Sequence, residues 1–126
     1  MTRLFKTLHF TRWMEKTGLS DALLVNAVRE MECGLIDADL GGGIVKKRIA
    51  VQGHGKRGST RTLIATNKND RWFFIFGFEK NERENINATE LKFLKQFATK
   101  LLKTSNQELD ISLKNNVLLE IHYEKD

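Results

Sequence analysis

RTLIATNKNDRWFFIFGF, spanning Arg61–Phe78, is the most informative segment for the architecture of this chain. Its apolar parts, residues 61–66 and 72–78, have the length and the β-branched and aromatic content of strands. The tetrapeptide between them, NKND at 67–70, is a typical turn sequence. The segment therefore predicts an antiparallel hairpin. Its second strand is apolar on both faces, which predicts core packing and a central position in a sheet rather than base stacking.

Two helices are predicted before this hairpin. Phe10, Trp13 and Met14 recur at helical spacing, and Gly18 is expected to end that helix. Ser20 is a good N-cap for the second helix. Its apolar positions are Leu23, Leu24, Ala27, Val28 and Met31, and Gly34 is expected to end it. The pattern indicates a helical hairpin with a short joint.

The remaining elements follow from composition and periodicity. A short edge strand is expected at 3–7, a loop at 35–43, a strand at 44–51 and a glycine-rich loop at 52–60. A charged connection at 79–86 leads to a long helix from Asn87. A break at 104–106, a short helix at 107–114 and a last strand at 117–122 complete the chain. This order predicts an α+β fold, a small antiparallel sheet with helices on one side.

Length and composition limit the classes of function. The 126 residues are expected to form a single domain, 1–126. The only cysteine, Cys33, excludes an intramolecular disulfide and a multi-cysteine metal site, and we expect it to be a small core residue. Glu82 and Glu84 lack histidine or carboxylate partners, so no metal and no cofactor are expected. No signal-peptide pattern or membrane-length apolar run is present, so a cytoplasmic protein without membrane contact is expected.

Charge is distributed unevenly along the chain. The total is 21 basic and 16 acidic residues, a net charge of +5. No acidic residue lies between Asp39 and Asp70, whereas this window holds seven basic ones: Lys46, Lys47, Arg48, Lys56, Arg57, Arg61 and Lys68. The rest of the chain is therefore mildly acidic. A concentrated basic block of this kind predicts a polyanion-binding face.

Within this block the stretch KKRIAVQGHGKRGSTRTLIA, residues 46–65, reads as strand, glycine-rich loop and strand. Backbone N–H groups of such a loop can surround an anion, and Arg48 and Arg61 could converge on it from the flanking strands. A solvated basic loop is the alternative. The pattern lacks a P-loop motif, which argues against a nucleotide hydrolase. Lys80 and Arg83 follow the apolar strand directly, either as functional residues or as surface ion pairs.

Three segments together carry a family resemblance: LIDADLGGGIVKKRIA at 35–50, GHGKRGSTRTLIA at 53–65 and DRWFFIFGFEKNERENI at 70–86. In this order they resemble the RelE-like toxins (RelE/ParE superfamily) of bacterial type II toxin–antitoxin modules, from about Phe5 to Lys103. The resemblance implies an N-terminal helical hairpin packed on a small curved, mainly antiparallel sheet, followed by C-terminal helices. Residues 104–126 extend beyond the minimal domain of that family.

The resemblance also implies a function. Such toxins typically cleave mRNA in the ribosomal A site as mRNA interferases, and a cognate antitoxin, often with a helix-turn-helix DNA-binding domain, blocks them. Matched residue by residue, the family's basic positions fall on Arg48, Lys56, Arg57, Arg61, Lys80 and Arg83. The chain departs from the pattern at 85–87, where some members have a tyrosine. The only tyrosine here is Tyr123, so that residue's role is unassigned.

RNA cleavage by side chains requires phosphate clamps and a base. Arginine does not deprotonate at neutral pH, so Arg48, Arg61 and Arg83 are expected to clamp phosphate. Lys56, among like charges, and His54 are the candidate bases, and we prefer Lys56 because sites of this family are built mainly from lysine and arginine. Lys46, Lys47, Arg57 and Lys80 are expected to bind RNA phosphates, and His9 and His122 to be structural. A non-catalytic nucleic-acid-binding module and a gyrase-inhibiting toxin on the same fold remain alternatives.

Overall fold

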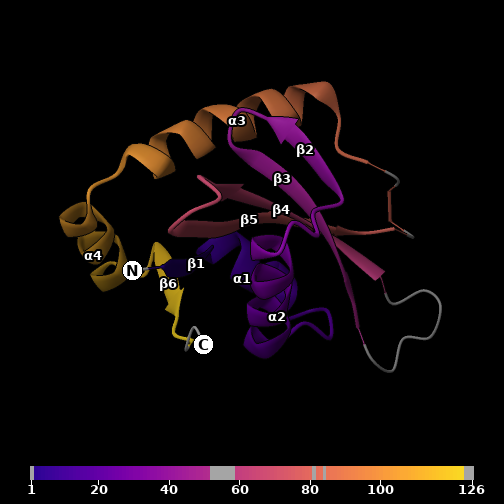
Figure 1. The fold of residues 1–126 in the computed structure, drawn as a ribbon, viewed down its shortest axis with the longest axis horizontal. Coiled ribbons are helices and arrows are strands. Elements are labelled where there is room, and N and C mark those ends of the chain that lie inside the picture. Colours follow the sequence, from indigo (N-terminus) through magenta and orange to yellow (C-terminus); the bar gives the residue numbers. More distant parts are fainter. Residues whose placement is uncertain (1, 52–58, 81, 84, 124–126) are drawn as a thin grey trace.

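The computed structural model describes residues 2–51, 59–80, 82, 83 and 85–123. Its elements are β1 (Arg3–Thr7), α1 (Leu8–Met14), α2 (Asp21–Glu32), β2 (Ala38–Gly41), β3 (Ile44–Ala50), β4 (Ser59–Thr66), β5 (Arg71–Glu79), α3 (Ala88–Lys103), α4 (Asn106–Lys114) and β6 (Leu118–Ile121). The strands form one sheet in the order β2-β3-β4-β5-β1-β6 (Figure 1). Only the pair β1–β5 is parallel. The α+β class and the mainly antiparallel sheet are confirmed.

The hairpin β4–β5 forms the middle of the sheet, as the sequence predicts. Trp72, Phe73 and Phe74 are almost completely buried, so the aromatic run is core. The pairing carries a β-bulge, because Leu63 pairs with Phe76 and the next residue of β4 pairs with Phe74. The extra residue in β5 reverses the alternation of its side chains between the two faces of the sheet. Phe76 and Phe78 therefore lie on the same face as Phe73.

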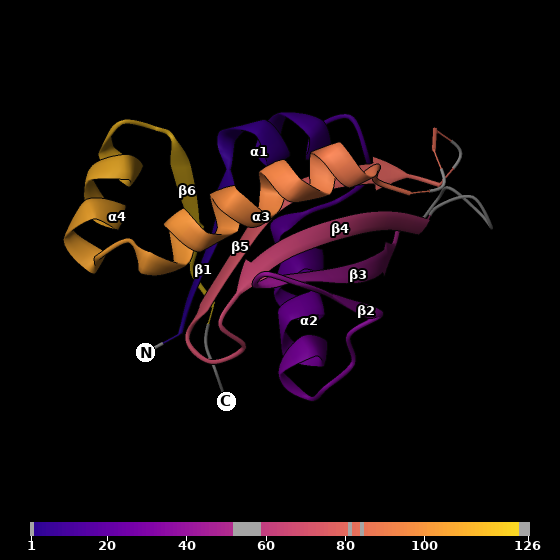
Figure 2. The ribbon, with the colours of Figure 1, turned by 90° about the horizontal axis from the view of Figure 1, so that it is seen from above.

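Helices cover both faces of the sheet, so the expectation of helices on one side is wrong. On one face α1 and α2 pack against Val45, Ile64 and Phe74. On the other face α3 and α4 pack against Ile44, Leu63 and other residues of the sheet. Figure 2 shows α3 crossing over the strands while α2 lies beyond them. The reason is that the central strands are apolar on both faces, and each face must be covered to exclude water.

The expected edge strand β1 is an interior strand. It pairs with β5 on one side and with β6 on the other. Leu4 and Phe5 point to opposite faces and are both fully buried. Because β6 comes from the far end of the chain, no local pattern at residues 3–7 reveals the second neighbour.

The expected loop at 35–43 contains the edge strand β2, so that prediction is also wrong. The turn to β3 is formed by Gly42 and Gly43, with φ of +62° and +83°. Positive φ at both central residues is typical of the tight turns that join antiparallel strands. A Cβ at Gly42 would lie 2.8 Å from the side chain of Lys95, so this turn also packs against α3.

The helix caps agree largely with the sequence. The side chain of Ser20 accepts a hydrogen bond from Leu23 N, and Asn87 and Glu90 form a reciprocal capping box at the start of α3. The helix α1 ends at Met14, earlier than Gly18 suggests, because its apolar stripe ends there. Cys33 is the exposed C-cap of α2, so its expected place in the core is wrong.

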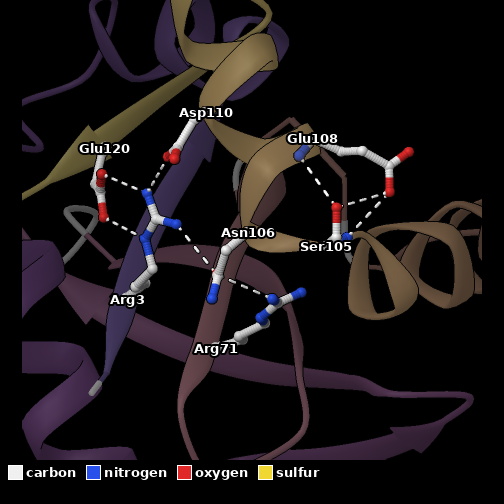
Figure 3. Close-up of polar contacts among 7 residues, drawn as sticks. All are labelled: Arg3, Arg71, Ser105, Asn106, Glu108, Asp110 and Glu120. Carbon is white, nitrogen blue, oxygen red and sulfur yellow. Dashed lines mark hydrogen bonds and ion pairs between the residues drawn. The ribbon is translucent and has the colours of Figure 1, made fainter.

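The C-terminal segment packs into the sheet. Leu109 of α4 and Leu118 of β6 belong to the core under α3. Arg3 of β1 connects these elements: its guanidinium donates to both carboxylate oxygens of Glu120, at 2.9 and 3.0 Å, and to Asp110 and Asn106 (Figure 3). Hydrogen bonding to Glu120 raises the pKa of Arg3 above its usual range. Within the described residues no helix is long and apolar enough to cross a membrane.

Candidate anion-binding site

Three rows of side chains cross β3, β4 and β5 on the face that α3 covers. Cross-strand partners share a face in an antiparallel sheet, so the register gives the rows directly. They are Ile44–Ala65–Phe73, Lys46–Leu63–Phe76 and Arg48–Arg61–Phe78. The first row is apolar core, the second is mixed, and the third has two arginines side by side. The sheet therefore changes from core to cationic surface within one face.

Arg61 occupies the middle of the third row. Its residue is only 7 % exposed, although it carries a permanent charge. The Nη1 atom is buried and has no hydrogen-bond partner among the residues that the structure describes. A buried donor without an acceptor is costly, by roughly 1–3 kcal/mol, and a charged one by more. An anion bound beside Arg61 would complete its hydrogen bonds.

Arg48 lies directly opposite Arg61 on β3 and is exposed. Its backbone N–H donates to Asp37 Oδ2 at 2.7 Å, which fixes the strand at this position. Lys46, two residues earlier, points to the same face and is half-buried. Two cationic side chains on neighbouring strands repel each other, and an anion between them removes the repulsion. The pair therefore favours a phosphate or a similar group.

Arg83 approaches this row from the connection after β5. Its Cζ atom lies 5.7 Å from the ring centroid of Phe76 and 5.9 Å from that of Phe78, the neighbour of Arg61. Cation–π contacts at these distances orient the guanidinium over the sheet. Glu90 accepts from both Nη atoms, at 2.5 and 2.8 Å. Arg83 is thus placed beside the row but already paired with a carboxylate.

Lys47 does not join this face. It alternates with Arg48 along β3 and points toward α2, where its Nζ contacts Glu30 Oε1 and Leu35 O, both at 2.9 Å. Only 9 % of its side chain is exposed. The structure assigns it to packing between β3 and α2, so we leave it out of the anion site. Lys80 is exposed directly after β5.

His54, Lys56 and Arg57 lie outside the described residues. Their roles as base and phosphate ligands stay predictions. Val51, before that segment, directly follows β3, the strand that carries Arg48. Ser59, after it, begins β4, the strand that carries Arg61.

Glu90 is the residue near the site that the sequence analysis missed. The signal was present, because Asn87 and Glu90 have the spacing of a capping box. That motif identifies a helix start, and it gives no indication that the same carboxylate reaches Arg83. Among the described residues no cluster of three or more His, Cys, Asp or Glu side chains could hold a metal ion.

The arrangement can bind an anion between two strands and hold it from more than one side. Planar guanidinium groups match two oxygens of a phosphate at once. Such groups also stabilise the extra negative charge of a pentacoordinate phosphorus in a transition state.

Comparison with known proteins then gives the family. The chain matches the family model for the RelE toxin of the RelE/RelB toxin–antitoxin system over residues 2–121. It belongs to this family and is a toxin of a toxin–antitoxin system, for which the family implies an antitoxin partner. A search of curated proteins found no significant match.

Proposed function

We propose that this toxin is an endoribonuclease that cleaves mRNA on the ribosome and is neutralised by a cognate antitoxin. The observation that carries the proposal is Arg61, a buried arginine with an unpaired Nη1 opposite Arg48. A toxin that acts on RNA needs a phosphate site of this kind, and the family membership gives the biological setting.

The proposed reaction uses side chains. The 2′-OH of the RNA loses its proton and attacks the adjacent phosphorus, and the bond to the 5′-oxygen breaks. The products are a 2′,3′-cyclic phosphate and a 5′-hydroxyl, whose oxygen takes its proton from water. Arg61 and Arg48 hold the phosphate and stabilise its added charge. Arg83 joins them when its guanidinium leaves Glu90. Lys56 or His54 accepts the proton, and Lys46, Arg57 and Lys80 contact neighbouring phosphates.

The central test is Arg61→Ala. Loss of one charge-stabilising donor typically reduces a rate by about 10²–10³-fold, so the expressed variant should be harmless. Arg12→Ala removes an exposed arginine of α1 and serves as the matched control. Full growth inhibition by a folded Arg61→Ala protein would contradict the proposal. A wild-type protein that binds programmed ribosomes and yields no cleaved mRNA would favour a non-catalytic binding module.

The identity of the base is tested by pH. Single-turnover cleavage is measured across pH for Lys56→Ala and His54→Ala. Loss of a histidine base removes a titration near or below neutral pH, whereas a lysine base titrates higher. A Lys56→Ala enzyme with a normal rate and an unchanged profile assigns the role to His54. If both variants stay active, the loop binds RNA and supplies no base.

The antitoxin is proposed to present an acidic segment to the basic face and to carry a helix-turn-helix domain. Complementary charge speeds encounter and is weakened by salt. The purified complex should therefore dissociate more readily as salt is raised. A complex that is unchanged at high salt indicates a mainly apolar contact.

A further inference from the structure

An apolar groove lies beside the arginine row. Its walls are the start of α1, the bulged part of β5 and the first turns of α3. The aromatic residues that line it are His9, Phe76, Phe93 and Phe97, and its polar lining residues are Thr7, Asn87, Thr89 and Glu90. None of these side chains is a proposed phosphate ligand, and the groove volume of about 720 Å³ is in the range of small-ligand pockets.

Two aromatic side chains of the groove present open surface. His9 is exposed, and its ring lies nearly parallel to Phe76, at 9° and a centroid separation of 6.0 Å. Phe93 is 66 % exposed, the highest exposure of the large hydrophobic side chains in the described part of the chain. The exposed phenyl ring presents apolar surface that a ligand in the groove would remove from water.

Arg83 connects the groove to the arginine row, because its guanidinium lies near Phe76 of the groove and Phe78 of the row. Phe76 carries His9 on one side and the Arg83 guanidinium within 5.7 Å of its ring centroid. Glu90 lines the groove and pairs with Arg83. A ligand that fits both parts must combine a negative charge with a flat apolar ring. A nucleotide has this combination, because its phosphate and its base are attached to one sugar.

We propose that this groove binds a nucleobase of the RNA whose phosphate lies on Arg61 and Arg48. The inference rests on the proposed function and adds a subsite to it. The unstacked base enters between His9 and Phe93, and its ring exchanges water contacts for aromatic contacts, as single-stranded RNA does on aromatic side chains. Charge complementarity favours this occupant over an apolar helix of a protein partner, because the Arg83 guanidinium borders the groove at Phe76 and an apolar helix offers it no negative charge.

The test uses two fluorescent probes that cannot be cleaved. One is a 2′-O-methyl tetranucleotide, and the other has the same phosphate backbone with tetrahydrofuran units in place of all four nucleotides. Wild-type protein should bind the base-bearing probe more tightly. Phe93→Ala should weaken only that probe, by roughly 5- to 150-fold for one stacked base. Ile111→Ala removes a similarly exposed side chain from α4 and should change neither probe.

Arg61→Ala separates this inference from the proposed function. It should weaken both probes, because it acts on phosphate. If it weakens neither, the proposed function fails, whereas a selective loss in Phe93→Ala would still support the groove. Equal binding of both probes by the wild type overturns the base subsite. So does a Phe93→Ala protein that binds RNA normally and no longer retains its coexpressed antitoxin, since the groove then belongs to the protein partner. Phe93→Trp should restore tight binding of the base-bearing probe.

Discussion

Arg3 and Arg61 are two arginines of interior strands that differ in how their charges are compensated. Arg3 donates from Nε, Nη1 and Nη2 to side chains of α4 and β6, with only 18 % of its side chain exposed (Figure 3). Arg61 is buried more deeply, and its Nη1 has no acceptor among the described residues. The charge of Arg3 is satisfied within the fold, so its role is structural. The charge of Arg61 is not satisfied among the described residues, and we propose that its role is functional.

The surroundings of these two arginines differ in the same way. Around Arg3, carboxylates from distant parts of the chain surround the cation and tie the C-terminal elements to β1. Around Arg61, the cross-strand neighbour is a second arginine, and Glu90 neutralises only Arg83. We therefore expect substitutions of Arg3 to change mainly stability and substitutions of Arg61 to change mainly activity.

The largest expected effect is that of Arg61→Met. Activity should fall by about 10²–10³-fold, as for the alanine variant. Stability should stay equal or rise, because an apolar side chain of similar volume removes a buried donor without an acceptor, which costs roughly 1–3 kcal/mol. Thermal unfolding and cleavage on programmed ribosomes measure the two quantities. A marked loss of thermal stability would show that Arg61 is satisfied in the folded protein and would remove the contrast with Arg3.

Arg3→Met should have the opposite profile. It leaves Glu120 without its bidentate partner, and hydrogen bonds between charged groups contribute about 1.5–3 kcal/mol. We expect a loss of about 2 kcal/mol in the free energy of unfolding, read from urea denaturation. Cleavage per folded molecule should be unchanged at low temperature. Reduced activity in a fully folded Arg3→Met protein would mean that the contacts of Arg3 affect the site around Arg61.

Glu90→Gln should have a smaller effect, in the direction of a gain. Glutamine also serves in a capping box, so α3 keeps its start while the competing charge beside Arg83 is lost. Partly exposed ion pairs contribute about 0.2–1 kcal/mol, so affinity for an RNA backbone should rise by up to about fivefold. Anisotropy with the abasic probe at several salt concentrations measures this. Unchanged affinity and salt dependence would indicate that Arg83 does not reach the phosphate.

The smallest effect is expected for Asp39→Asn, at an exposed ion pair with Lys68. The hydrogen bond from Lys68 holds the pKa of Asp39 below its usual range. A carboxylate with a lowered pKa stabilises the fold above its unfolded-state pKa, and this contribution is lost as pH falls through its folded-state pKa. The melting temperatures of wild type and variant should therefore differ slightly at neutral pH and converge in acid. A difference that persists in acid would assign the effect to the Gly41 turn contact instead.

Much of the local structure was predictable from short-range patterns. The turn at 67–70, the N-caps Ser20 and Asn87 and the buried strand β5 each depend on residues close together in sequence. The basic window around Arg48 and Arg61 was visible for the same reason, since charge is a property of composition. The function proposed for it depends on the resemblance to RelE-like toxins, because arginine and lysine on a sheet are compatible with many ligands.

The arrangement of the site and the position of β1 depend on contacts between segments far apart in the sequence. Pairing between β3 and β4 places Arg48 opposite Arg61, and the bulge in β5 brings Phe78 beside them. Lys47 and Arg48 are neighbours with similar charge, and only the packing of α2 on one face and α3 on the other separates a structural lysine from a site arginine. The interior position of β1 required β6, more than a hundred residues away in sequence. Side-chain alternation along a strand is local, but which face meets a helix, a partner strand or a ligand is set by contacts that form only when the whole chain is folded.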